Sequence, residues 1–213
     1  MEKLNSALIA VLTNIIERRT LSKTSKPHHT VRIRKYIAAM VGGGIAHDIY
    51  KSEFLKWNMD IVIPACSLHD IGKILISDVI LLKPGKLSVD EFNIIRKHTE
   101  YGEKIIDEIS DETEDLSQEA LAFITMAKKF IGEHHERWDG QGYPKNLKGN
   151  EISLEGRVMA IADVYDVLRR EKPYKRAHTH SQTMDIINSD SGSHFDPKMI
   201  EILNYVEKDF EKV

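Results

Sequence analysis

The chain has 213 residues, of which 41% are hydrophobic and 30% are charged, and its formal net charge at pH 7 is -3. This length and composition predict one domain with a hydrophobic core. The slightly acidic balance argues against broad nucleic-acid binding, so a phosphate ligand must be met by local positive charge. No apolar stretch approaches the roughly 20 residues that span a bilayer, and the N-terminus lacks a signal-peptide pattern, so we expect a cytoplasmic protein. Cys66, the single cysteine, can form no disulfide within the chain.

The first part of the chain is typical of helices joined by short breaks. Apolar spacing predicts a helix over about 6–18, followed by a polar joint over 21–28. A second helix is expected over about 29–41, ending at a run of three glycines, and a third over about 51–69. Pro64 predicts a kink or a boundary within that third stretch.

The second part continues the helical pattern. Residues 88–91 match a capping box and open a helix that carries His98. Further helices are expected over about 118–138 and 154–170, separated by a loop rich in glycine, and Asp196-Pro197 is typical of the start of the last helix. No strand pattern of any length is present. The sequence therefore predicts an all-α fold, a single-domain helical bundle.

Metal-type ligands recur along this helical chain. The pair His69-Asp70, followed by Gly72 and Lys73, lies near the predicted end of a helix, where imidazole and carboxylate can enter one cavity. A second pair, His47-Asp48, follows the glycine run and has no helical setting, so we interpret it as a solvent-exposed loop or cap. The same dipeptide thus serves as an internal control.

Three downstream positions strengthen the interpretation of a metal site. Two adjacent imidazoles, His134 and His135, are costly to bury without a shared partner, and the apolar residues around them indicate an inward-facing segment. Asp163 interrupts an apolar run and requires a cation, whereas His98 alone carries little information. Together these residues indicate a metallohydrolase with more than one divalent ion.

The joint pattern resembles the HD-GYP phosphodiesterases over roughly residues 25–205. The motifs that carry the resemblance are His69-Asp70-Ile71-Gly72-Lys73, Leu82-Lys83-Pro84-Gly85, His98, His134-His135-Glu136 through Gly142-Tyr143-Pro144, Ala162-Asp163-Val164-Tyr165-Asp166 and His194-Phe195-Asp196-Pro197. The resemblance implies a helical bundle of the HD superfamily. It also implies hydrolysis of cyclic di-GMP to linear pGpG or GMP, by a hydroxide held between metal ions.

The resemblance assigns roles residue by residue. The implied metal ligands are His29 (or its neighbour His28), His69, Asp70, His98, His134, His135 and Asp163, with Asp70 bridging two ions. Lys73 is expected to face the scissile phosphate, which makes it catalytic together with Asp70. The implied substrate-binding residues are Lys73, Asp166, Lys172, Lys175 and Tyr143, and the loop Gly142-Tyr143-Pro144 is implied to contact diguanylate cyclase domains.

The chain departs from the family pattern at several positions. Ser25 stands where trinuclear members carry a glutamate, so we expect two ions, of which iron or manganese fit the ligands best and nickel, cobalt and zinc remain compatible. Lys172 replaces an arginine and loses its bidentate fork. Arg169 and Arg170 replace small polar residues, which either tightens phosphate binding or crowds the pocket.

Three functions stay open on the sequence. The first is a cyclic di-GMP phosphodiesterase formed by residues 25–205. Residues 1–24 are interpreted as an N-terminal helix and joint that would end a linker to a regulatory domain, and 206–213 as a helix end. The second is an HD-superfamily hydrolase of another nucleotide or of cyclic GMP-AMP. The third is a non-catalytic module that binds cyclic di-GMP. The intact ligand positions favour an enzyme over the third function.

Overall fold

The computed structural model describes residues 29–171 and 176–213, together with residues 11, 15 and 17. The described chain is helical and contains no β-strand, which confirms the predicted all-α class. Its longer helices are α2 (His29–Ala46), α4 (Met59–Cys66), α6 (Val89–Arg96), α7 (His98–Asp111), α8 (Gln118–Glu133), α9 (Leu154–Leu168), α10 (His180–Ser189) and α11 (Pro197–Tyr205). Shorter elements are α3 (Lys51–Phe54), η1 (Ile71–Leu75), α5 (Asp78–Leu81), η2 (Gly149–Glu151) and α12 (Glu207–Glu211).

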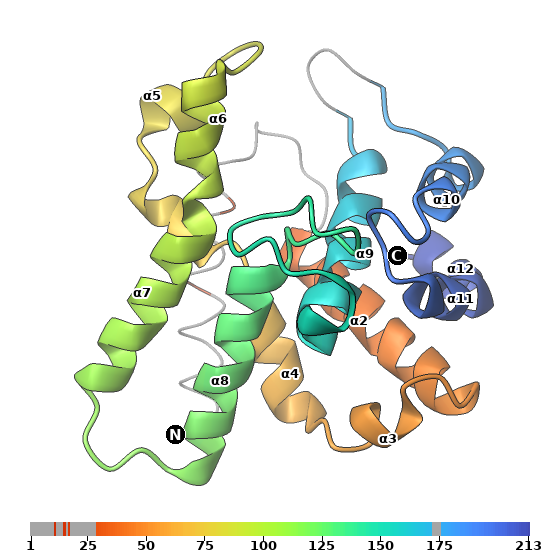
Figure 1. The fold of residues 1–213 in the computed structure, drawn as a ribbon, viewed down its shortest axis with the longest axis horizontal. Helices are drawn as coiled ribbons and strands as arrows, with labels where there is room; N and C mark the ends of the chain where they lie inside the picture. Colours follow the sequence, from red (N-terminus) through yellow and green to blue (C-terminus); the bar gives the residue numbers. More distant parts are fainter. Residues whose placement is uncertain (1–10, 12–14, 16, 18–28, 172–175) are drawn as a thin grey trace.

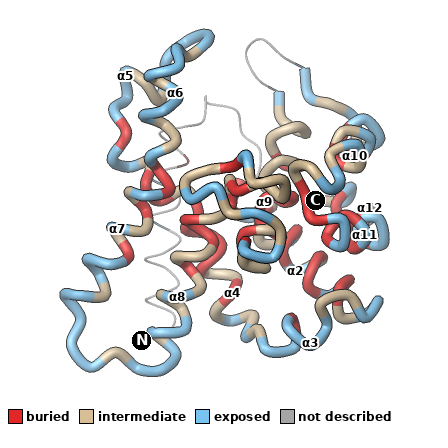
Figure 2. Tube along the Cα trace, viewed as in Figure 1, coloured by how far each residue is buried: buried red, intermediate tan, exposed pale blue. Residues whose placement is uncertain are grey.

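The hydrophobic core lies where α2, α4, α8 and α9 meet. Helix α2 packs on α9, α8 packs on both α4 and α9, and α7 joins η1 to α8 (Figure 1). Buried residues concentrate in this central group, whereas α5 and α6 bury no residue and extend away from it (Figure 2). The elements that carry the candidate ligands therefore converge on the centre of the bundle.

Helix α2 continues through the three glycines at which we predicted its end. Gly43 lies against the Val206 side chain and Gly44 against the Phe54 ring, with no room for a Cβ atom at either position. The prediction was wrong because these glycines permit close helix packing, and burial of the neighbouring apolar residues outweighs the conformational cost of glycine in a helix.

Two other predicted helices are divided or shortened. The stretch 51–69 forms α3 and α4, because Asn58 caps α4 with a 3.0 Å bond from the Asp60 amide; Pro64 lies inside α4. The helix predicted over 118–138 ends at Glu133.

His98 does not lie inside the helix that Ser88 caps but begins α7. The capping box at Ser88 and the Asp196 cap with Pro197 in the first turn are both confirmed.

The C-terminal residues belong to the same core. Phe210 is buried, and its ring stacks on that of Tyr36 with centroids 4.5 Å apart. The packing therefore continues past residue 205, at which we predicted that the catalytic domain ends. No helix of the described part combines the length and apolar character needed to cross a bilayer.

Candidate metal centre

Four of the candidate ligands lie just past helix ends, which was predicted for His69 and Asp70 but not for His134 and His135. His69 and Asp70 occupy the turn between α4 and η1, and His134 and His135 follow the last turn of α8. The last carbonyls of a helix lack partners within it. His69 Nδ1 lies 3.0 Å from the Cys66 carbonyl, and His134 Nδ1 lies 2.9 Å from the carbonyls of both Phe130 and Ile131. The histidines thus terminate their helices by bonding to these carbonyls.

Two clusters of donor atoms result, each with its atoms within 4.8 Å of one another. The first contains His29, His69 and Asp70, and its two imidazoles face each other with Nε2 atoms 3.1 Å apart. The second contains His98, His134 and His135, and the Nε2 atoms of its first two members are 3.3 Å apart. Five of these six residues are imidazole donors, a set that suits transition metals better than calcium or magnesium.

Asp70 lies between the two clusters. Its Oδ2 atom is 3.5 Å from His69 Nε2, and its Oδ1 atom is 3.5 Å from His98 Nε2 and 3.9 Å from His134 Nε2. The two oxygens of one carboxylate therefore face different imidazole clusters. This is the arrangement required of a carboxylate that bridges two ions.

The tautomers of the buried histidines direct lone pairs into the same space. A carbonyl oxygen can only accept a hydrogen bond, so Nδ1 carries the proton in His69, His98 and His134; the His98 bond to Ile95 is 2.7 Å. Their Nε2 atoms consequently present lone pairs. Facing lone pairs repel each other unless a cation lies between them, so the residues present fit a metal ion.

Burial keeps these imidazoles in the neutral form that binds metal. It lowers the pKa of His69 and of His134 to about 3, although the nearby Asp70 carboxylate opposes the shift. The pKa of His135 is also lowered well below its ordinary value by burial. Burial alone would raise the pKa of Asp70, but the Lys73 ammonium and the surrounding imidazoles hold it well below its usual range. The ligands are therefore neutral histidines around an ionised carboxylate.

The two aspartates of α9 occupy different positions. Asp163 Oδ1 lies 3.5 Å from His29 Nε2, the nitrogen that faces His69. Asp166 lies behind the same ring and is bound to Nδ1 at 2.7 Å. It also accepts bonds from Arg32 Nε at 2.5 Å and pairs with Arg170 at 2.8 Å.

Asp166 therefore does not have the substrate-binding position that we predicted. It is 1% exposed, and its two oxygens are occupied by the His29 ring and two guanidinium groups. These bonds hold its pKa below the usual range despite burial. A carboxylate that orients a ligand histidine through the ring nitrogen remote from the metal is a common feature of metal sites. Arg170 contacts this carboxylate, and Arg169 donates to the His178 carbonyl at 2.9 Å.

Lys73 and Tyr143 border the centre. The Lys73 ammonium is 2.5 Å from Asp70 Oδ2, where it can meet a phosphate bound at the clusters. Tyr143 is half-buried, because it stacks on His135 with centroids 4.7 Å apart while the Arg96 guanidinium covers the ring at 4.3 Å. Four residues named in the sequence analysis, Ser25, His28, Lys172 and Lys175, lie outside the described residues.

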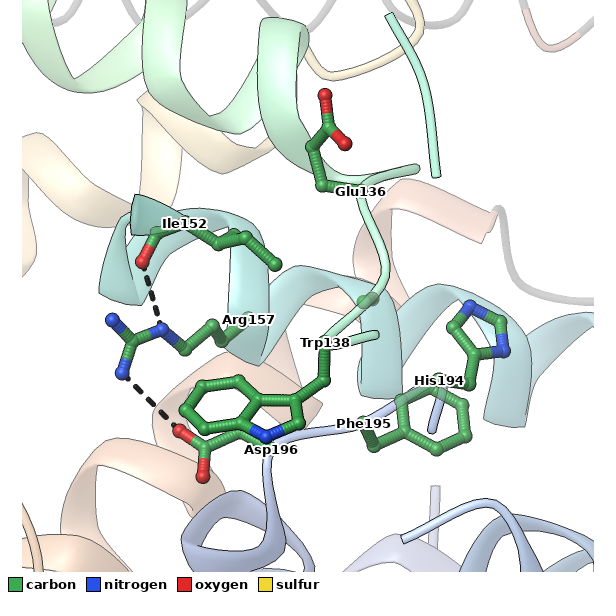
Figure 3. Close-up of a pocket in the computed structure, with 8 residues that line it drawn as sticks. Glu136, Trp138, Ile152, Arg157, His194, Phe195 and Asp196 are labelled. Atoms are coloured by element: carbon green, nitrogen blue, oxygen red, sulfur yellow. Dashed lines mark hydrogen bonds and ion pairs between the residues drawn. The ribbon is translucent and has the colours of Figure 1, made fainter. Parts of the chain in front are cut away.

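The glycine-rich loop after His135 is fixed to the bundle by its neighbours. Glu136, itself buried, accepts the amides of Lys145 at 2.7 Å and Leu147 at 3.0 Å. Arg157 donates to the Ile152 carbonyl and the Asp196 carboxylate beside the Trp138 ring, around a small cavity (Figure 3). The loop is therefore held against the bundle, with Tyr143 beside the candidate ligand His135.

Sequence reasoning missed Glu17. This residue is 6% exposed and accepts bonds from the Thr30 amide at 2.5 Å and from the Thr30 hydroxyl. It lines a cavity together with His29, Ser67 and His69. Thr30 belongs to the first turn of α2, so Glu17 binds one of the free amides there, next to the first ligand. No periodicity or motif around Glu17 indicated this contact.

Comparisons with known proteins agree with this geometry. The model of the HD domain family matches residues 45–199. A Vibrio cholerae protein named "Probable cyclic di-GMP phosphodiesterase" is 37% identical over 210 residues, which cover 99% of this chain and 46% of that protein. The 3'3'-cGAMP-specific phosphodiesterase 2 of Vibrio cholerae is 41% identical over 144 residues, or 68% of this chain and 26% of that protein.

A solved structure shows the same fold. The crystal structure of the cyclic GMP-AMP specific phosphodiesterase V-cGAP3 of Vibrio cholerae superimposes with a TM-score of 0.53 at 20% identity, covering 95% of this chain and 48% of that chain. This chain spans less than half the length of each of the three proteins.

Proposed function

Because the chain belongs to the HD domain family, we propose that it is a metal-dependent phosphodiesterase that hydrolyses cyclic di-GMP to linear pGpG, GMP or both. One observation carries the proposal: the two oxygens of Asp70 face two separate clusters of buried imidazoles. A structural histidine core has no need of such a carboxylate, whereas cleavage of a phosphodiester by two ions does.

We propose two divalent ions, with iron or manganese preferred. His29, His69 and Asp70 would hold one, and His98, His134 and His135 would hold the other, with Asp70 shared between them. Asp163, near the His29 Nε2 atom, would complete the set. When bound, such ions supply Lewis-acid activation of water and of the phosphate.

The protein residues contribute positioning and charge to the reaction. Asp166 keeps the His29 ring oriented, and the carbonyls of Cys66, Ile95 and Phe130 keep the other rings in the required tautomer. The Lys73 ammonium offsets charge on the phosphate and on the leaving oxygen, an effect worth several kcal/mol as an order of magnitude. The loop after His135 covers one ligand on that side, because Tyr143 stacks on His135.

The experiment combines metal analysis with product analysis. The purified protein is expected to contain about two transition-metal ions per chain. It is also expected to convert cyclic di-GMP to pGpG or GMP, and chromatography measures these products. A reproducible metal content near zero or near three would contradict the two-ion form. A filled centre with cyclic di-GMP bound but not cleaved would instead identify a binding module.

Cyclic GMP-AMP is a second candidate substrate, because a relative named for that activity is 41% identical over 68% of this chain. The two cyclic dinucleotides share both phosphates and differ in one base. Parallel assays at equal concentrations separate the alternatives, since hydrolysis of cyclic GMP-AMP alone would overturn the choice of cyclic di-GMP.

We further propose that the loop containing Gly142-Tyr143-Pro144 contacts diguanylate cyclase domains. Because Tyr143 is packed against His135, the surface available to a partner is formed by the exposed neighbours Gln141 and Asn146. Gln141→Ala is expected to weaken binding of a purified diguanylate cyclase domain in a titration without altering metal content. Unchanged binding would contradict this surface.

A further inference from the structure

Arg96 lies at the edge of the metal centre and is not part of the ligand set. It is the last residue of α6, two positions before His98, and its side chain is partly exposed. Its guanidinium carbon is 4.3 Å from the centroid of the Tyr143 ring, which in turn stacks on His135. A single aromatic ring therefore separates this cation from a candidate ligand.

The other arginines around the site are already bound to acidic groups. Arg32 and Arg170 pair with Asp166, and Arg157 pairs with Asp196. Within the described residues, Arg96 forms no ion pair with a carboxylate, so its charge is available to an external anion. An arginine is charged at every relevant pH, and this positive charge stands out in a chain with net charge -3.

The hydrogen-bond donors of Arg96 are free to act. Its guanidinium carbon lies over the Tyr143 ring, and within the described residues its N–H groups form no hydrogen bond. The ring thus holds the fork in place with little loss of donors. Such a preorganised fork matches the two oxygens of a phosphate.

We propose that Arg96 binds the second phosphate of a cyclic dinucleotide, the one that is not cleaved. This inference rests on the proposed function, because the scissile phosphate would be held by the ions and by Lys73. The other phosphate lies across the macrocycle and needs a separate cation. Among the described residues, Arg96 offers such a cation beside Tyr143 and His135.

The test compares a substrate with two phosphates and a substrate with one. Arg96→Met keeps the length of the side chain and removes its charge, and Lys97→Met removes one charge from the exposed neighbouring position as a control. For cyclic di-GMP, Arg96→Met is expected to raise KM by roughly tenfold to a hundredfold with kcat little changed. For bis(p-nitrophenyl) phosphate, both kinetic constants should equal those of the parent. Metal content should be unchanged, and Arg96→Lys should restore part of the loss.

Two results would overturn the inference. If Arg96→Met equals the parent on cyclic di-GMP, the cation does not contact the substrate. If Arg96→Met impairs both substrates or lowers metal content, the residue acts only by holding Tyr143 and His135. A parent protein that cleaves the small diester but neither cyclic dinucleotide contradicts the proposed function itself, so the two failures are distinguishable.

Discussion

The chain contains the dipeptide His-Asp twice, and the two copies have opposite environments. His69 is 1% exposed, donates from Nδ1 to a helix-end carbonyl and contacts two other imidazoles, those of His29 and His134. His47 is exposed, and its ring stacks on Tyr205 with centroids 3.7 Å apart. Asp48 has a φ of 59° and pairs with Lys51 at 2.5 Å on the surface.

The difference shows that the environment, and not the dipeptide, makes a metal site. The ring of His47 is exposed to water and stacks on one aromatic side chain, and Asp48 pairs with one lysine, so neither polar group needs a metal. Around His69, the available partners are other lone-pair donors. The region around His69 is therefore expected to need a cation in its observed form, whereas the region around His47 does not.

Replacement of the shared carboxylate is the strongest way to test this contrast. Asp70→Ala is expected to abolish hydrolysis, a loss of at least about a thousandfold, and to deplete metal, because both clusters lose a ligand and a negative charge. Elemental analysis and product chromatography measure the two effects. Asp48→Ala and His47→Ala should change neither, and equal damage from Asp70→Ala and Asp48→Ala would show that the assignment of the site is wrong.

Much of the site could be predicted because the ligand types and their spacing are carried by local sequence. The contrast between the two His-Asp pairs followed from their flanking residues, and the capping box at Ser88 followed from a four-residue pattern. Helix ends were less predictable. Gly43 and Gly44 signalled a break but lie in a continuous helix, because their role is set by Val206 and Phe54, which are remote in the sequence.

The contacts around His29 could not be predicted for the same reason. Asp166 is 137 positions away in the sequence and meets the ring only through the packing of α2 on α9. Glu17 accepts the Thr30 amide, which lies 13 positions later in the sequence. A resemblance to a family predicts which residue types stand at which positions. Which side of a ligand histidine ring is contacted by a carboxylate depends instead on how the helices pack.

The Asp166 bond offers a second test of the contrast, with a smaller effect. Asp166→Asn keeps the shape of the side chain but removes the charge that holds the His29 proton on Nδ1. We expect metal affinity to fall by about tenfold to a hundredfold, with the KM for cyclic di-GMP little changed. Competition with a chelator measures the affinity. Asp48→Asn is the matched surface control. A raised KM with unchanged metal affinity would restore the substrate-binding role that we first predicted.

The pH dependence of stability provides a third test, made on metal-free protein. Burial lowers the pKa of His69 to about 3, whereas the unfolded chain takes up this proton near pH 6.5. The unfolded state is therefore favoured as the pH falls below 6.5, by about 1.4 kcal/mol per pH unit for this imidazole, until the folded pKa is reached. Urea unfolding at pH 5.5 and pH 4.5, between the two pKa values, measures the slope. His69→Gln should reduce the slope by that amount and His47→Gln should not, and equal slopes in His69→Gln and the parent would contradict the assigned burial.

The smallest expected effect concerns the helix that leads to the surface pair. Gly42 lies inside α2 with open space where a Cβ atom would be, whereas a Cβ at Gly44 would meet the Phe54 ring and the Ile49 carbonyl. Gly42→Ala is therefore expected to raise the free energy of unfolding by roughly 0.5–1 kcal/mol, because alanine loses less conformational freedom in a helix. Gly44→Ala should lower it by overpacking. Denaturant melts measure both, and metal content should stay at the parent value in Gly42→Ala, since this end of α2 is remote from the ligands. A loss of metal in Gly42→Ala would show that the region around His47 is coupled to the centre, and the contrast between the two His-Asp pairs would then no longer hold.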